Sequence, residues 1–184
     1  MNIFDTYYEE ANYSLIINKV IDYIRDVKQN NPYHKYNLLE HTEHVVKYLQ
    51  SHGADSDLIL AGWLHDVGKV ATKTVNPKTG VDNFLGHAEA GVEWIEKNFP
   101  QVPQRVKDLV ANHDRVSEIK KEGKIKTLLH LHDDKWIEDL FLLREADAFS
   151  HSDFGREEQM EQFAKQRERF NKIKMKEQLN ASQK

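Results

Sequence analysis

Apolar residues recur three and four positions apart along most of the chain, and this spacing is typical of helices with one buried face. Segments with this pattern occur in these ranges: 12–29, 38–52, 56–66, 87–99, 106–113, 136–148 and 154–179. No segment of the sequence shows the convincing polar–apolar alternation of a half-buried strand. The pattern therefore predicts an all-α fold in which helices form one array.

Turn-forming residues separate the predicted helices. Proline disfavours helix in the residue before it, so Asn30-Asn31-Pro32 ends the first segment. Asn76–Gly80 breaks the chain again and begins a loop. Residues 1–11 have no clear periodicity and stay unassigned, whereas the charged stretch 114–126 predicts an exposed loop.

The length of 184 residues suits one domain with a sizeable core. We expect this single domain to cover residues 1–184, with its core at about residues 35–150. The helices at 12–29 and 154–179 would then flank the core.

Composition and charge exclude several classes of protein. The chain has no cysteine, so disulfides and thiolate metal sites are ruled out. A net charge of −4 argues against bulk binding of nucleic acid. Residues 1–6 lack the basic and apolar parts of a signal peptide, and no apolar stretch approaches the ~20 residues that span a bilayer. We therefore expect a cytoplasmic protein without membrane association.

The first candidate for chemistry is His65-Asp66, which follows the apolar run 58–63. Burying an adjacent imidazole and carboxylate costs several kcal/mol unless each finds a partner. A metal ion can serve both groups, although a simple His–Asp hydrogen bond near a helix end would also satisfy them. Gly68 lets the backbone turn or approach a ligand closely. Lys69 places a positive charge beside the site, unless it is simply solvated.

Other polar residues of the same kinds lie at predicted helix ends or among apolar neighbours: His41, His87, His113 and Asp147. Antiparallel helices can bring such ends together in one interior site, although each residue alone is also compatible with an ordinary half-buried side chain. His44 and Arg115 are candidates for the rim of a pocket, with solvent exposure as the alternative. His130 and His132 are expected to be solvated.

The order of these residues resembles the metal-site signature of the HD-domain phosphohydrolase superfamily. The motifs that carry the resemblance are His41 to Val45, Leu64-His65-Asp66-Val67-Gly68-Lys69, Phe84 to Ala90, Val110 to Asp114 and Arg144 to Ala148. The Gly68-Lys69 ending and the Gly86-His87 element look closest to the HD domain that accompanies bacterial tRNA nucleotidyltransferases. The resemblance covers about residues 35–150 and implies a helical array of the HD-domain type.

The resemblance implies a role for each motif residue. One divalent metal would be bound by His41, His65, Asp66 and Asp147. A second metal or a substrate phosphate would be bound by His87 and His113. Asp66 and Lys69 would be the catalytic residues. The donor set of nitrogen and oxygen suits Mn²⁺, Fe²⁺, Co²⁺, Ni²⁺, Zn²⁺ or Mg²⁺, with one or two ions in the site.

The function that the resemblance implies is metal-dependent phosphohydrolysis. The substrate would be a phosphomonoester or a cyclic or linear phosphodiester of a nucleotide or an RNA end, with metal-activated water as the nucleophile. One alternative is a catalytically weak HD-fold module that binds nucleotides for regulation. Another is a structural helical protein whose histidines are incidental.

Overall fold

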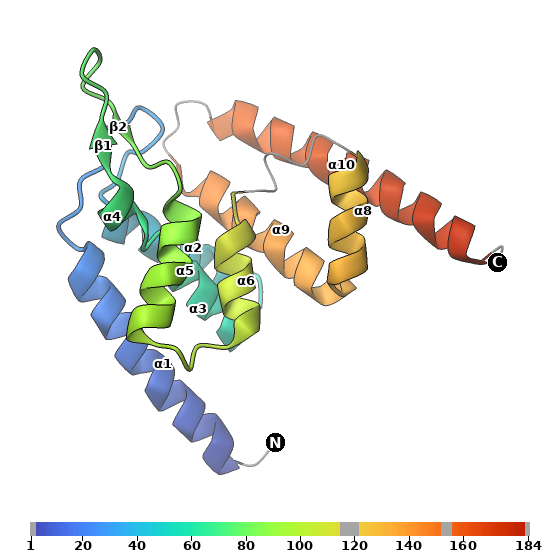
Figure 1. Ribbon diagram of the computed structural model, residues 1–184, viewed down its shortest axis with the longest axis horizontal. Coiled ribbons are helices and arrows are strands. Elements are labelled where there is room, and N and C mark those ends of the chain that lie inside the picture. The colour runs from blue at the N-terminus through green and yellow to red at the C-terminus, as the bar shows by residue number, and fades with distance from the viewer. Residues whose placement is uncertain (1–2, 115–121, 152–155, 183–184) are drawn as a thin grey trace.

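The computed structural model describes residues 3–114, 122–151 and 156–182. The helices are α1 (Ile3–Ile24), α2 (Leu38–Ser51), α3 (Ser56–Leu64), α4 (Lys69–Thr72), α5 (His87–Asn98), α6 (Gln104–Asn112), α8 (Glu122–Leu131), α9 (Asp134–Phe149) and α10 (Arg156–Ser182). Two short strands, β1 (Thr74–Val75) and β2 (Asp82–Asn83), pair antiparallel. Figure 1 shows this arrangement and confirms the all-α class.

The structure differs from the sequence-based prediction in helices α1 and α8. Helix α1 begins at Ile3, inside the stretch that showed no periodicity, and ends at Ile24 rather than at residue 29. The predicted loop 114–126 is wrong for residues 122–126, which form the first half of α8. The physical reason is Ile125, which is fully buried in the common core. Tertiary packing of Ile125, together with the partly buried Leu128 and Leu129, stabilises a helix that the charged residues at its start do not indicate.

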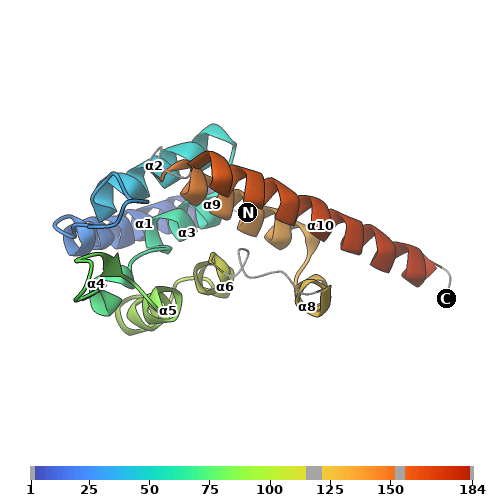
Figure 2. The same cartoon turned by 90° about the horizontal axis from the view of Figure 1, so that it is seen from above.

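The core lies where α2, α3, α6 and α9 meet. It contains completely buried side chains from each of these helices, among them Val45, Leu60, Leu109 and Leu143. In Figure 2, helices α4, α5, α6 and α8 lie along one side of the molecule, and α1, α2, α3, α9 and α10 lie along the other. The predicted metal-binding residues lie on the four core helices, directly after them, or at the start of α5. The core packing therefore sets the positions of these residues.

The hairpin of β1 and β2 projects from the array beside α4 (Figure 1). Its base is tied to the segment after α1, because Asp82 Oδ2 accepts a hydrogen bond of 2.6 Å from Asn30 N and pairs at 2.7 Å with Lys73 Nζ. Gly80 has a φ of +70° in the turn, a conformation that L side chains rarely adopt. These contacts fix the approach of the chain to Phe84 and α5.

Helix α10 packs against α9 and α8 by one edge. Phe163 and Phe170 are buried, and both rings contact Phe141 of α9, with centroid distances of 5.9 and 5.1 Å. Arg167 pairs with Glu138 of α9. In Figures 1 and 2 the C-terminal end of α10 extends beyond the other helices. Among the helices of the described part of the chain, none is both long and apolar enough to cross a membrane.

Candidate metal centre

Helix caps position the first candidate residues. Asn37 caps α2 in a capping box: its Oδ1 accepts from Glu40 N at 2.9 Å, and Glu40 Oε2 accepts from Asn37 N at 3.2 Å. The cap fixes the first turn, so His41 lies one turn into the helix and is buried. Asp55 caps α3 by accepting from Leu58 N at 3.0 Å. The apolar run of α3 is therefore held in the core, and His65-Asp66 follow at its buried end.

A close backbone contact positions α5. A Cβ atom placed on Gly68 would lie 2.0 Å from the carbonyl oxygen of His87 and 2.4 Å from the amide nitrogen of Gly91. Any other residue at Gly68 would therefore push α5 away from the turn that carries Asp66. His87 is the first residue of α5, so this contact sets its distance from Asp66.

Four side chains from different parts of the chain converge in the core. His41 Nε2 lies 3.4 Å from His65 Nε2, 3.4 Å from Asp66 Oδ2 and 3.1 Å from Asp147 Oδ1. His65 Nε2 lies 3.3 Å from Asp66 Oδ2 and 3.9 Å from Asp147 Oδ1. All four residues are buried. The structure thus brings together the four residues to which the family resemblance gives one metal.

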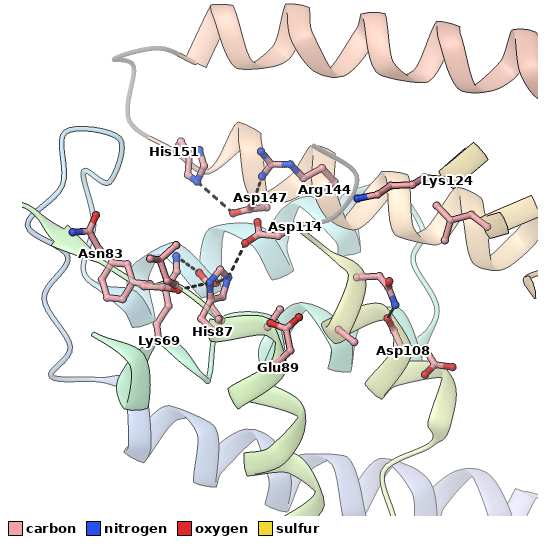
Figure 3. A pocket seen from close by; sticks show the side chains of 18 of the residues that line it. Lys69, Asn83, His87, Glu89, Asp108, Asp114, Lys124, Arg144, Asp147 and His151 are labelled. Carbon is pink, nitrogen blue, oxygen red and sulfur yellow. Dashed lines mark hydrogen bonds and ion pairs between the residues drawn. The ribbon is translucent and has the colours of Figure 1, made fainter. Parts of the chain in front are cut away.

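A second group surrounds the other oxygen of Asp66. His87 Nε2 lies 3.3 Å and His113 Nε2 3.8 Å from Asp66 Oδ1, and the two nitrogens are 3.1 Å apart. Asp114 adds a carboxylate, with its Oδ2 at 3.1 Å from His87 Nε2 (Figure 3). Asp66 therefore directs one oxygen to each pair of histidines.

Backbone carbonyls hold the outer nitrogen of three of these rings. The Nδ1 atoms of His65, His87 and His113 lie 2.7, 2.9 and 2.7 Å from the carbonyl oxygens of Gly62, Phe84 and Val110. A carbonyl only accepts, so each Nδ1 donates, and Nε2 of each ring faces the site and offers it a lone pair whenever the ring is neutral. This arrangement is common among metal-binding histidines, whose second nitrogen donates to a carbonyl or carboxylate.

Burial and charge set the protonation of the site. Burial lowers the pKa of His41 and of His87, despite the neighbouring carboxylates. Burial alone would raise the pKa of Asp66, but the charges of His65 and Lys69 hold it well below its usual range. For Asp147, burial is likewise outweighed by the charge of His151 and the hydrogen bond of His41, which hold its pKa well below normal.

His113 has the opposite tendency. Burial would lower its pKa, but the nearby carboxylates of Asp66 and Asp114 raise it to about 9. In the absence of a metal ion, a proton on His113 Nε2 can thus balance the negative charge of the carboxylates of Asp66 and Asp114. The facing nitrogen and oxygen atoms therefore need a cation among them, and either a proton or a metal ion can supply it.

The residues fit a divalent metal. Bonds of about 2.0–2.2 Å from one ion to nitrogen and oxygen place neighbouring ligand atoms about 3.0–3.6 Å apart. Most separations in the first group fall in this range, at 3.1 to 3.4 Å. Asp66 Oδ2 is buried without a hydrogen-bond partner, although Lys69 Nζ lies 2.6 Å away in an ion pair. Among the described residues, three sets of three side chains could hold an ion. They are His41 with His65 and Asp66, Asp66 with His87 and His113, and His41 with Asp147 and His151.

A cavity of about 1020 Å³ opens over the two groups of ligands. Its wall includes Asp66, His87 and Asp147, together with the cationic side chains Lys69 and Arg144. Lys69 is buried rather than solvated and is bound to Asp66 Oδ2, with Gln29 Oε1 at 3.2 Å.

Arg144 pairs with Asp147 Oδ2 from the same face of α9, as Figure 3 shows. This pairing leaves Asp147 Oδ1 directed at the histidines.

The predicted rim residues have different outcomes. His44 does not line the cavity, and its ring packs edge-on against Tyr36 at a centroid distance of 4.3 Å. Arg115 lies outside the described residues.

Of the two histidines predicted to be solvated, His130 is exposed as predicted. His132 is half-buried against the ring of Trp136 and lines the cavity, so the prediction of solvent exposure is wrong for it.

Sequence reasoning missed three residues that the structure brings to the site: His34, Asp114 and His151. His34 lies in the segment between α1 and α2, and burial lowers its pKa to about 3. Asp114 directly follows His113, and this position in the sequence could have identified it as a site residue. His151 follows Asp147 by four residues, and this spacing on a helix places both on one face.

Comparison with known proteins agrees with this geometry. The model of the family described as HD domain matches residues 38–152, more than half of the chain. This family comprises metal-dependent phosphohydrolases that bind divalent metal ions. The chain is also similar to a CC-adding tRNA nucleotidyltransferase of Thermus thermophilus, with 44% identity over 71 residues. That match covers 34% of this chain and 16% of the relative, so the chain matches about a sixth of the length of that curated protein.

Proposed function

The chain belongs to the HD domain family, and from this membership and the geometry of the site we propose that it hydrolyses phosphoesters with two divalent metal ions. The first ion would be held by His41, His65, Asp66 and Asp147. The second would be held by Asp66, His87 and His113. When bound, such ions activate water as a nucleophile at neutral pH and neutralise charge on the phosphoryl oxygens.

One observation carries the proposal for two ions. Asp66 Oδ2 lies 3.3 to 3.4 Å from the Nε2 atoms of His65 and His41, whereas Asp66 Oδ1 lies 3.3 and 3.8 Å from those of His87 and His113. A carboxylate with one oxygen toward each imidazole pair is suited to bridging two cations.

The remaining charged residues of the cavity suit an anionic substrate. Lys69 offers a buried positive charge beside Asp66, and we propose that it contacts a phosphoryl oxygen. Arg144 holds Asp147 by its outer oxygen and so orients the inner oxygen as a ligand. Asp66 is the central residue, because it contributes to both proposed metal sites.

The proposed substrate class is a nucleotide or an RNA end, attacked at a phosphomonoester or a cyclic or linear phosphodiester. A cavity of about 1020 Å³ is at the upper end of the range for small-molecule sites, ~300–1,000 Å³, and has room for a nucleoside with its phosphate. The similarity to part of a tRNA nucleotidyltransferase supports a nucleotide-related substrate.

The test is a metal-panel assay on phosphomonoesters, cyclic 2′,3′-nucleotides and dinucleotides. We expect hydrolysis of at least one ester that depends on an added transition metal or Mg²⁺ and disappears with a chelator. His65→Ala and Asp66→Asn should each lower kcat by at least a hundredfold with unchanged helical content. His52→Ala is the matched control, because His52 is exposed and hydrogen-bonds only within the end of α2, to Ser51 and the carbonyl of Tyr48. Full activity of Asp66→Asn would overturn the proposal. If the wild-type protein binds metal and nucleotide without turnover, the result would favour the alternative function, a regulatory HD-fold module that binds nucleotides.

A further inference from the structure

A histidine outside the motifs of the family signature faces the first proposed metal site. His151 lies two residues beyond the end of α9, and its side chain is buried. We infer that His151 is a further nitrogen ligand of the ion at His41 and Asp147, and that Gln159 of α10 orients it. This inference rests on the proposed metal site.

Distances relate His151 to the ligands already described. Its Nε2 lies 3.5 Å from Asp147 Oδ1 (Figure 3), the same oxygen that lies 3.1 Å from His41 Nε2. The rings of His41 and His151 are nearly parallel, with centroids 5.6 Å apart and an interplanar angle of 21°. His41, Asp147 and His151 form a set whose donor atoms all lie within 4.8 Å of one another.

The outer nitrogen of His151 fixes which atom faces the site. His151 Nδ1 lies 2.6 Å from Gln159 Oε1. An amide oxygen only accepts, so Nδ1 donates and Nε2 faces Asp147 Oδ1. When the ring is neutral, these two acceptors need a cation between them, and a metal ion can take the place of the proton that would otherwise lie on Nε2. His65, His87 and His113 have the same arrangement, with a backbone carbonyl in the place of Gln159.

The geometry favours one shared ion over a separate one. Asp147 Oδ1 faces the Nε2 atoms of His41, His65 and His151, and its Oδ2 is occupied by Arg144. Because Asp147 has a single inward oxygen, the Nε2 atoms of all three imidazoles lie around the same atom. His151 would therefore add a ligand to the first ion, and Asp66 would remain the residue shared with the second.

The inference connects α10 to the site. Helix α10 packs on α9 through Phe163 and Phe170, which contact Phe141. Gln159 lies one turn before Phe163 on the same helix face. The packing of α10 thus sets the position of Gln159, and Gln159 sets the orientation of His151. Gln159 is a positioning residue in this account, because it acts on the ion only through His151.

The experiment measures Co²⁺ binding to the metal-free full-length protein by calorimetry and by the visible absorption of Co²⁺ with one equivalent added. His151→Ala should weaken Co²⁺ binding at the tighter site at least tenfold and change the absorption spectrum, because a nitrogen ligand is lost. Gln159→Leu should weaken binding about tenfold, as expected for loss of a group that orients a ligand. His52→Ala should bind Co²⁺ as the wild type does.

Each outcome separates this inference from the proposed function. If the wild type binds Co²⁺ but His151→Ala leaves affinity and spectrum unchanged, His151 is not a ligand, and the four-residue site stands. If the wild type binds no Co²⁺, the proposed metal site itself is wrong. If His151→Ala does not fold, Gln159→Leu decides, because it retains every proposed ligand. Unchanged Co²⁺ binding in Gln159→Leu then overturns the inference.

Discussion

The Nε2 atoms of His87 and His113 lie 3.1 Å apart, while the Nδ1 atom of each ring lies within hydrogen-bond distance of the backbone carbonyl three residues before it. Two imidazoles held in this way both offer lone pairs to one point, and a shared cation relieves their repulsion. Asp66 Oδ1 faces the same point, whereas its Oδ2 faces His41 and His65. The site is therefore two groups of ligands joined by one carboxylate.

The first prediction concerns the number of bound ions. His113→Ala should lose one of two bound ions per chain and retain the other, because His41, His65 and Asp147 do not depend on His113. Asp66→Asn should weaken binding of both ions. Metal content after gel filtration, measured by elemental analysis, checks this. A His113→Ala protein with the same metal content as the wild type would contradict the two-ion assignment.

The second prediction concerns Gly68, where an added Cβ would lie 2.0 Å from the carbonyl oxygen of His87. Gly68→Ala should destabilise the protein by about 1–3 kcal/mol or more, as overpacking does in well-packed interiors. It should also separate His87 from Asp66 and weaken the second metal site. Urea denaturation and metal content measure the two effects.

Gly123 supplies the matched control, because it lies in α8 with nothing within 4 Å of an added Cβ. Gly123→Ala should leave metal binding unchanged and stabilise the protein by up to about 1 kcal/mol, the difference in helix propensity. Equal stability of the two alanine variants would show that the structure accommodates a Cβ atom at Gly68.

The third prediction is a pH dependence that arises away from the metal ligands. Burial alone would raise the pKa of Asp55, but hydrogen bonds from Lys135, Leu58 N and Arg105 lower it to about 2. The folded protein thus binds the proton on Asp55 more weakly than the unfolded chain does. The stabilisation is fully present above pH 4 and is lost as the pH falls toward 2.

Asp55→Asn keeps a good helix cap but removes the charge. At pH 7 the variant should be less stable by about 0.5–1 kcal/mol, because exposed ion pairs contribute little. The difference from the wild type should shrink as the pH falls from 4 to 2. Urea denaturation of both proteins across this range measures it, and a difference that stays constant would contradict the assigned ion pairs.

The fourth prediction separates phosphate binding from metal binding at Lys69, whose Nζ lies 2.6 Å from Asp66 Oδ2. Removing this positive charge takes away an interaction with an anionic substrate but also a repulsion of the metal ion. Lys69→Met should therefore lower kcat/KM at least tenfold without weakening metal binding. Lys78→Met, at the exposed tip of the hairpin, is the control. Parallel loss of metal and activity in Lys69→Met would mean that Lys69 only holds Asp66 in place.

Much of this architecture follows from sequence patterns that act locally. The apolar run before His65 and the periodicity of α9 place motif residues near buried helix ends. Their convergence could be inferred only through the resemblance, because spacing along the chain does not determine which helices pack together.

The features of the structure that sequence analysis missed depend on tertiary contacts. His151 was absent from the predicted site, and its neighbours are Asp147 one turn earlier and Gln159 of α10. The helical state of residues 122–126 depends on burial of Ile125 among residues distant in sequence. The restriction at Gly68 comes from the backbone of α5. The contacts of Gln159, Ile125 and Gly68 join residues distant in sequence, so local patterns do not encode them, whereas the spacing of four between Asp147 and His151 was a local signal.

The most direct test of the account is anomalous diffraction from crystals soaked separately in Mn²⁺, Co²⁺ and Zn²⁺. We predict a peak at about 2.0–2.3 Å from His41 Nε2, His65 Nε2, Asp66 Oδ2 and Asp147 Oδ1 with at least one of these ions. Well-ordered crystals with these four side chains in place, and no anomalous peak among them with any of the three, would contradict the central claim.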